Sequence, residues 1–186
     1  MTPFVEQLNF FVALGALIVQ AGTFLLLAVF FLRQKVPFCG IITRGIGRWG
    51  LHIAFLLFSF ATAMSLYYSE VLGFTPCGLC WVQRVFVYPQ VILFAVALWK
   101  KESRIADYSI ALSFFGAIVG LYQHYLQMGG PELVPCPAAA AAGDCAKRII
   151  FEFGYITFPL VGFSMLAFAI AIMLFVRQSY KEQERV

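Results

Sequence analysis

The chain has 186 residues, of which 62% are hydrophobic and only 12% are charged. A soluble domain of this length needs far more charge to cover its surface, so most of the chain is expected to lie in lipid. The formal net charge of +4 is carried in short clusters between long apolar runs. That distribution is typical of membrane topology and argues against nucleic-acid binding.

Five apolar segments are predicted to cross the membrane, because each reaches or approaches the roughly 20 residues that a hydrocarbon core requires. In chain order they lie between Glu6 and Arg33, Arg48 and Glu70, Arg84 and Lys100, Asp107 and Glu132, and Glu152 and Arg177. Only the third is short, with 15 uncharged residues. Its helix must therefore begin earlier, between Pro76 and Cys80, and carry Arg84 within its first turns. A charged residue inside a spanning helix indicates a functional site.

Basic residues divide unevenly between the two sides of the predicted membrane, ten on one side and two on the other. The ten are Arg33, Lys35, Arg44, Arg48, Lys100, Lys101, Arg104, Arg177, Lys181 and Arg185, and the two are Lys147 and Arg148. Because cytoplasmic segments carry the excess of Lys and Arg, the N-terminus is expected outside and the C-terminus in the cytoplasm.

The same topology sorts the five cysteines. Cys77, Cys80, Cys136 and Cys145 fall on the outer side, where oxidising conditions allow disulfides to persist. Cys39 falls alone on the cytoplasmic side, where we expect a free thiol without a role. One outward pair would suit a structural disulfide, whereas two pairs on the same side indicate thiol–disulfide exchange.

The first pair belongs to a C-x-x-C motif at the predicted start of the third helix, directly after Pro76. Unpaired amide groups and the positive dipole end of a helix start favour a thiolate at Cys80. Arg84 follows Cys80 by four residues and shares its helix face, so its guanidinium can favour the thiolate further and bind an anionic carbonyl oxygen. This combination in apolar surroundings suits a two-electron acceptor such as a quinone. The alternative is that Arg84 only extends to the membrane interface.

The second pair lies in the loop after the fourth span, where eight residues separate Cys136 from Cys145. Pro135 and Pro137 flank Cys136, which disfavours helix and keeps the thiol in an extended segment. The small ring between the two cysteines closes easily. Such a loop is suited to the approach of another protein, although a disulfide that only orders a flexible loop is the alternative.

Three segments form a recognisable combination with these cysteines: Cys-Gly-Leu-Cys-Trp-Val-Gln-Arg at 77–84, Leu-Tyr-Gln-His-Tyr-Leu-Gln at 121–127, and Phe-Gly-Tyr-Ile-Thr-Phe-Pro at 153–159. Together they resemble the DsbB/BdbC disulfide bond formation proteins. The resemblance covers residues 50–176 and implies an all-α fold, a four-helix transmembrane redox bundle, in the bacterial inner membrane. Residues 1–49 would add one N-terminal transmembrane helix with its cytoplasmic loop, and residues 177–186 a cytoplasmic tail.

The resemblance also implies an activity. Members of that family reoxidise a DsbA/BdbD-like thioredoxin-fold partner and pass the electrons to ubiquinone or menaquinone. By resemblance, Cys136 would form the mixed disulfide with the partner, and Cys145 would then exchange with Cys77. The redox-active disulfides would be Cys77–Cys80 and Cys136–Cys145, with Cys80 as the thiolate that meets the quinone.

The quinone would be bound by Arg84 and by His124, near the outer end of the fourth span; no metal ligands are expected. A lone histidine in a spanning helix equally suits a packing or hydrogen-bonding role. Two features depart from the family pattern. The first span, residues 8–32, has no counterpart in the four-helix bundle, and the loop cysteines are closer together than in the best-known enterobacterial form.

Three other classes are open to this sequence. Vitamin K epoxide reductase-like enzymes also combine a helical bundle, a C-x-x-C and a loop pair, but their loop pair precedes the C-x-x-C. A zinc site of four cysteines normally has two tight pairs, which C-x8-C is not. A transporter or channel is disfavoured because the spans hold almost no polar residues besides Arg84 and His124.

Overall fold

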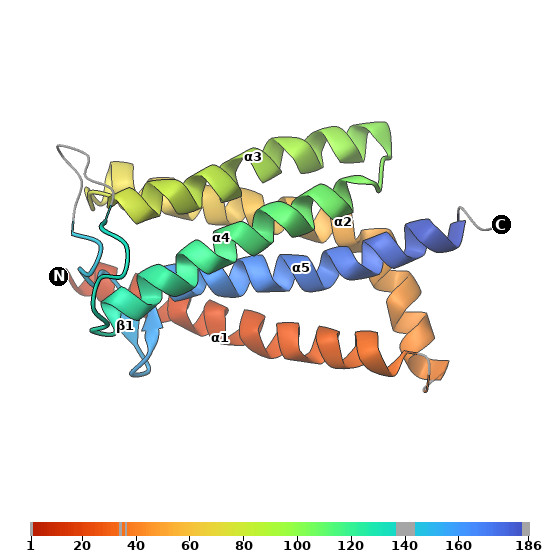
Figure 1. Cartoon of the computed structure of the whole chain (residues 1–186), viewed down its shortest axis with the longest axis horizontal. Coiled ribbons are helices and arrows are strands. Elements are labelled where there is room, and N and C mark those ends of the chain that lie inside the picture. Colours follow the sequence, from red (N-terminus) through yellow and green to blue (C-terminus); the bar gives the residue numbers. More distant parts are fainter. Residues whose placement is uncertain (1, 34, 36, 137–143, 184–186) are drawn as a thin grey trace.

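The computed structural model describes residues 2–33, 35, 37–136 and 144–183, except the side chains of residues 37–39, 41, 42, 44 and 183. Its five long helices are α1 (Pro3–Leu32), α2 (Pro37–Leu66), α3 (Gly78–Lys100), α4 (Ile105–Gln127) and α5 (Phe158–Gln183) (Figure 1). Each contains a segment long and apolar enough to cross a membrane. The predicted all-α fold with five spans is confirmed, and the chain is a multi-pass membrane protein.

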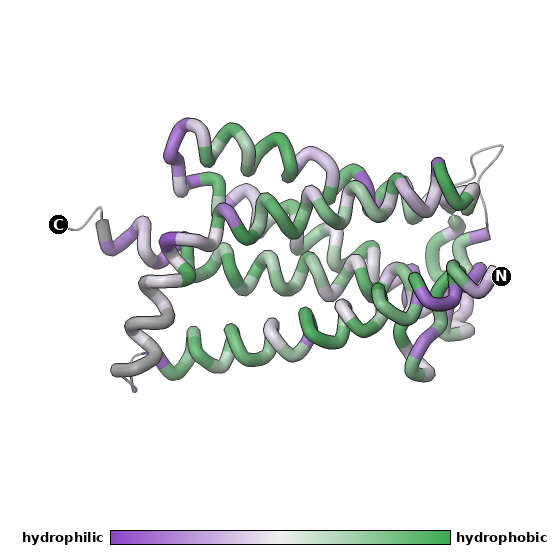
Figure 2. Tube along the Cα trace, turned by 180° about the vertical axis from the view of Figure 1, so that it is seen from behind, coloured by the Kyte–Doolittle hydropathy of each residue, from purple (hydrophilic) through white to green (hydrophobic). Residues whose placement is uncertain are grey.

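Helix α5 lies at the centre of the structure and packs against α4, α2 and α1. Helices α2 to α5 share one apolar core, which includes the fully buried side chains of Phe58, Phe94, Leu166 and Met173. Helix α1 runs along the outside of this bundle beside α5 (Figure 1). The arrangement is therefore a four-helix bundle with one added N-terminal helix. Hydrophobic residues fill the middle of the helices and hydrophilic residues gather toward the two ends (Figure 2).

Small and polar residues bring α3 and α4 together within the core. A Cβ atom at Gly116 would lie 2.8 Å from the Cβ of Phe86, so the two helices approach too closely there for any side chain. One turn after Phe86 on α3, Gln90 bonds to two serines of α4. Ser109 donates a hydrogen bond of 2.6 Å to Oε1 of Gln90, and Gln90 Nε2 lies 3.2 Å from the Ser113 hydroxyl oxygen. Polar groups buried in lipid must be paired in this way, which fixes how α3 and α4 face each other.

Two segments expected to be loop or tail are helical. Helix α2 begins at Pro37, well inside the predicted connection, although its candidate span begins only at Gly45. Helix α5 continues past Arg177, which pairs with Asp107 at 2.7 Å, and ends at Gln183. Charged residues do not stop a helix, so counting uncharged residues locates the hydrocarbon part of a helix and not its ends.

A short hairpin, which the sequence did not predict, precedes α5. Strand β1 (Phe151–Glu152) pairs antiparallel with β2 (Ile156–Thr157), with Phe151 opposite Thr157. Gly154 in the turn has a φ of 78°, a conformation that glycine adopts without strain. The hairpin lies at the same end of the molecule as the N-terminus and the start of α3, whereas the C-terminus lies at the opposite end (Figure 1).

Candidate functional site

Helix α3 begins at the C-x-x-C motif. Cys77 is the N-cap residue, with extended backbone, and its sulfur accepts a hydrogen bond of 3.3 Å from the backbone amide of Cys80. The two sulfur atoms lie 2.7 Å apart as free thiols, with Cys77 buried and Cys80 partly exposed. Cys80 therefore stands in the first turn, where the amide groups of the helix start face it, as Pro76 led us to expect.

A glutamine from the neighbouring helix α4 forms hydrogen bonds with both sulfur atoms. Nε2 of Gln123 on α4 donates to the sulfur of Cys77 at 3.0 Å and to that of Cys80 at 3.1 Å. The hydrogen bond with Cys80, together with burial, raises the pKa of the Cys77 thiol, so Cys77 stays protonated at neutral pH. Donors directed at Cys80 stabilise negative charge on its sulfur. Gln123 lies in the 121–127 segment that carries the family resemblance, but the sequence alone predicts no role for it.

Arg84 is buried in the same region, with 9% of its surface exposed. Its Nε donates to the hydroxyl of Ser65 at 3.1 Å and its Nη2 to the Ser65 carbonyl at 3.0 Å. Nη1 is buried without a hydrogen-bond partner among the described residues. The guanidinium carbon lies 4.9 Å from the ring centre of Trp81 and 5.7 Å from that of Tyr88. Arg84 is thus held by neutral groups, with one donor left for a ligand.

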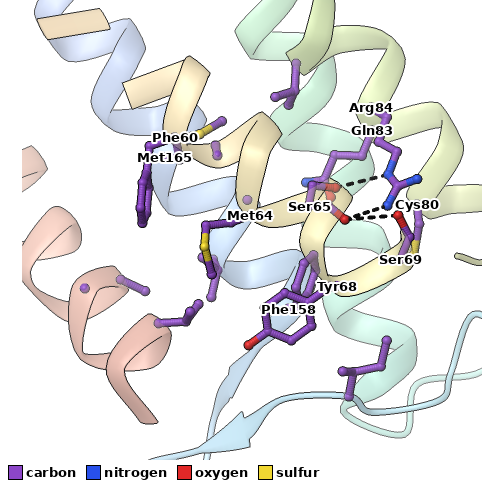
Figure 3. Close-up of a pocket in the computed structure, with 18 of the residues that line it drawn as sticks. Phe60, Met64, Ser65, Tyr68, Ser69, Cys80, Gln83, Arg84, Phe158 and Met165 are labelled. Carbon is purple, nitrogen blue, oxygen red and sulfur yellow. Dashed lines mark hydrogen bonds between the residues drawn. The ribbon is translucent and has the colours of Figure 1, made fainter. Parts of the chain in front are cut away.

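The sulfur of Cys80 and the guanidinium of Arg84 border a cavity of about 490 Å³ between α1, α2, α3 and α5. Polar side chains of Cys80, Arg84, Ser65 and Ser69 lie on one side of it, and Phe60 and Met165 on the other (Figure 3). Gln83 also lines the cavity, and its Nε2 is buried without a hydrogen-bond partner in the described chain. The cavity combines unpaired donors at one end with a large apolar remainder.

Ser65 and Ser69 reach the cavity from the end of the second span. There the helix continues as a π-helical turn, η1 (Tyr67–Val71), in which Tyr68 is buried. Such turns are frequent at functional sites because they redirect side chains and backbone carbonyls. The carbonyl of Ser65, which accepts from Arg84, also lies 3.3 Å from the Ser69 hydroxyl. No pattern in the sequence predicts this turn.

The second cysteine pair packs against the first. Cys136 and Cys145 are joined by a disulfide, with their Cα atoms 6.2 Å apart. Cys145 is buried in an apolar cluster with Cys77 and Leu126, against which Cys80 and the partly exposed Cys136 also pack. The structure therefore brings the four predicted cysteines together at one end of the bundle.

Helix α4 anchors the loop that carries this disulfide. The hydroxyl of Tyr122 accepts a hydrogen bond of 2.8 Å from the amide of Val134, and Gln127 Nε2 donates to the Lys147 carbonyl at 2.9 Å. Because Tyr122, Gln123 and Gln127 lie on one helix, α4 holds both the loop disulfide and the C-x-x-C sulfurs. It thereby fixes the position of one pair relative to the other.

The remaining predictions concern His124, Cys39 and metal ligands. Nδ1 of His124 lies 2.8 Å from the hydroxyl oxygen of Thr157 on β2, and His124 is not among the residues that line the cavity. The side chain of Cys39 lies outside the described residues. Over residues 2–33, 35, 37–136 and 144–183, no cluster of three or more His, Cys, Asp or Glu residues is arranged to hold a metal ion.

Comparison with known protein families shows which family the chain resembles. The family model described as disulfide bond formation protein DsbB matches residues 47–178. The chain belongs to the DsbB family. As a DsbB-family protein with five spanning helices, it is a disulfide-generating membrane protein and an oxidoreductase.

Curated relatives of this DsbB-family chain carry similar names. It is 34% identical over 145 residues to the SPbeta prophage-derived disulfide bond formation protein B of Bacillus subtilis, covering 77% of this chain and 96% of the relative. It is 41% identical over 110 residues to the probable disulfide formation protein C 1 of Bacillus anthracis, covering 58% and 78% respectively. It is 32% identical over 126 residues to the disulfide bond formation protein C of Bacillus subtilis, covering 65% and 89%. No solved structure matches the chain.

Proposed function

We propose that this protein is a protein-dithiol:quinone oxidoreductase. It oxidises a DsbA/BdbD-like thioredoxin-fold partner and transfers the two electrons to ubiquinone or menaquinone. The observation that carries the proposal is the cavity among apolar helices, in which the Cys80 sulfur stands beside a buried guanidinium with an unpaired donor. A quinone fits this cavity because its carbonyl oxygens can accept from Arg84 and its apolar part can fill the remainder.

The partner is proposed to react at Cys136, the more exposed cysteine of the loop disulfide. A partner thiolate attacks the Cys136 sulfur, the Cys136–Cys145 bond breaks, and Cys145 leaves as a thiolate. The second partner thiol later displaces Cys136, which completes the partner's disulfide. Each exchange breaks one S–S bond and forms one, so no electrons are lost in these steps.

Transfer to the inner pair starts from the Cys77–Cys80 disulfide and follows from the shared apolar cluster of Cys145 and Cys77. The Cys145 thiolate attacks the Cys77 sulfur, and Cys80 leaves as a thiolate that Gln123 and Arg84 stabilise. Cys136, once the partner has left it, attacks the Cys145 sulfur; the Cys145–Cys77 bond breaks, the loop disulfide is restored, and Cys77 and Cys80 are left reduced. Re-forming the Cys77–Cys80 disulfide then releases two electrons and two protons.

A bound quinone supplies an acceptor for those two electrons and two protons, which convert it to the quinol. Arg84 would hold an anionic carbonyl oxygen, and the apolar helices would exclude water from Cys80. The acceptor is needed because thiol exchange alone cannot drive the cycle. A partner as oxidising as DsbA, whose reduction potential is about −120 mV, needs a stronger oxidant to regenerate its disulfide. That His124 contacts the quinone remains a prediction, and its contact with Thr157 does not support it.

The proposed location is the bacterial inner membrane, with the N-terminus and all four paired cysteines outside and the C-terminus in the cytoplasm. The excess of Lys and Arg at the opposite end supports this orientation. It places the cysteines where a secreted thioredoxin-fold protein can reach them and where disulfides persist.

The test mixes oxidised, purified protein with a reduced thioredoxin-fold partner and a short-tailed quinone without oxygen, and follows quinol formation. The wild-type chain should form quinol. Arg84→Ala should raise the quinone concentration needed for half-maximal rate at least about tenfold, since a hydrogen bond to a charged group contributes about 1.5–3 kcal/mol. Its exchange with the partner should stay unchanged. Arg104→Ala, at the far end of the bundle, is the matched control; an unchanged quinone requirement in Arg84→Ala contradicts the proposal.

A further inference from the structure

Helix α1 forms one wall of the cavity that borders Cys80 and Arg84. Six of its residues line that cavity: Leu8, Phe11, Val12, Gly15, Ala16 and Val19. Their spacing of three and four residues places them on a single helix face, which extends about 16 Å at 1.5 Å per residue. The remaining lining residues come from α2, η1, α3, α5 and the segments that precede α3 and α5. Helix α1 lies across the cavity from Arg84 (Figure 3).

The matched family model begins at residue 47, so α1 lies wholly outside it. The residues that supply polar groups to the cavity, including Cys80, Gln83 and Arg84, all lie inside it. The cavity is therefore built jointly: the family region provides the polar end, and the additional helix provides an apolar side.

Specific polar contacts fix α1 in this position. Asn9 is 3% exposed; its Oδ1 accepts a hydrogen bond of 2.7 Å from the Tyr68 hydroxyl, and its Nδ2 donates to the Ile149 carbonyl at 3.1 Å. Farther along the helix, Gln20 Nε2 donates to the hydroxyl of Ser164 on α5 at 2.8 Å. Hydrogen bonds between helices within lipid orient them strongly. The wall is thus attached at both ends of its cavity-lining face.

The chemistry of this wall selects the part of a ligand that it contacts. Its six residues offer only apolar groups, so they can bind by hydrophobic and dispersion contacts and not by hydrogen bonds. Gly15 contributes no side chain, and a Cβ placed there would meet nothing within 4 Å. Gly15 lies in the middle of the lining face, so a side chain placed there would extend into open space.

We propose that α1 is part of the quinone site, where its inner face binds the apolar tail side of the molecule and Gly15 keeps that space open. This inference rests on the proposed function, and it assigns the additional helix a role in quinone affinity and tail selection. Helix α1 contributes no group to the thiol–disulfide exchange, so changes to its inner face should alter quinone binding alone.

The first test is photochemical and does not depend on turnover. The full-length protein in detergent is incubated with a benzoquinone whose short alkyl tail carries a diazirine, irradiated and digested. We expect label on the peptide that contains residues 8–19, and we expect excess decyl-benzoquinone to remove it. Label confined to α2, α3 and α5, or label on α1 that the competitor does not reduce, overturns the inference.

The second test narrows the cavity. Gly15→Leu should raise the quinone concentration for half-maximal rate at least about fivefold, the lower range of what overpacking costs, and should reduce the photolabel on α1. Gly15→Ala should give a smaller rise, and partner oxidation at saturating quinone should be unchanged. Gly45→Leu is the matched control, because that glycine of α2 also has nothing within 4 Å and does not line the cavity.

The outcomes separate the two proposals. If the wild-type chain reduces quinone in an Arg84-dependent manner but Gly15→Leu behaves like Gly45→Leu, then the role of α1 is wrong and the proposed function stands. If the wild-type chain forms no quinol, both proposals fail. An equal loss of thermal stability in Gly15→Leu and Gly45→Leu, with only Gly15→Leu affecting the photolabel, supports the inference.

Discussion

At the scale of residues, the start of α3 gathers donors around two sulfur atoms in a membrane protein that offers few polar groups. Gln123, the backbone amide of Cys80 and the helix start all face this pair, and Arg84 stands one turn away. A buried donor without a partner costs about 1–3 kcal/mol, so the unpaired groups of Arg84 and Gln83 at the cavity point to an acceptor that the ligand supplies.

Gln123 provides the sharpest prediction at this scale. Gln123→Leu removes a donor that reaches both sulfurs, and a hydrogen bond to a charged group contributes about 1.5–3 kcal/mol. We expect iodoacetamide to alkylate Cys80 of the reduced protein at least about tenfold more slowly at neutral pH, as measured by peptide mass spectrometry.

The control for this variant is Gln90→Leu, since Gln90 is equally buried but bonds to Ser109 and Ser113. It should leave the alkylation of Cys80 near the wild-type rate. Equal rates for Gln123→Leu and the wild type would show that Gln123 does not support the thiolate.

The residues of the site were partly predictable from the sequence. Cys77, Cys80 and Arg84 are local, because a helix start and a four-residue spacing place them together without knowledge of other helices. Gln123, Gln83 and Ser65 were not predictable, because their roles depend on which faces of α2, α3 and α4 meet. His124 was predicted by resemblance; in the structure its ring contacts Thr157, and it does not line the cavity.

At the scale of elements, α3, α4 and α5 approach one another closely beside the cavity. A Cβ at Gly120 of α4 would lie 2.6 Å from Gln83 Nε2 and 3.1 Å from the carbonyl oxygen of Pro159. The glycine therefore allows Gln83 of α3 to sit between α4 and α5 next to the cavity.

Filling this contact should destabilise the bundle. We expect Gly120→Val to lower the free energy of unfolding by about 1–3 kcal/mol, the usual cost of overpacking, because the Pro159 backbone cannot move freely. Thermal melts in detergent would measure the loss. Gly45→Val makes the same substitution in α2 where nothing lies within 4 Å, and it should melt close to the wild type. Equal melting temperatures for the two variants would contradict the packing argument.

Hydropathy predicted the elements better than their ends. The five apolar runs became five helices, but the start of α2 at Pro37 and the end of α5 at Gln183 lie among charged residues. The pair of two-residue strands before α5 and the π-helical turn after α2 leave no periodic pattern, since each is too short for one.

At the scale of the whole molecule, an odd number of spans places the two termini on opposite sides of the membrane. The start of α3, where the four paired cysteines pack together, lies at the end that holds the N-terminus, and α2 begins at the other end (Figure 1). This separation leads to a prediction about labelling. In intact cells, a membrane-impermeant maleimide should label a variant that retains only Cys136, and it should label a variant that retains only Cys39 after permeabilisation alone. The reverse pattern would exclude the proposed orientation.

The proposed relay passes two electrons from the reduced partner through the loop cysteines and then through Cys77 and Cys80 to a quinone in the cavity. An anaerobic reaction of Cys80→Ser beside the wild-type chain, with the partner and quinone both in excess, measures this transfer most directly. The wild type should form quinol in a one-to-one ratio with partner disulfide, whereas Cys80→Ser should form no quinol and should oxidise at most one partner molecule per chain, through its Cys136–Cys145 disulfide. Quinol formation by Cys80→Ser at the wild-type rate would contradict the account.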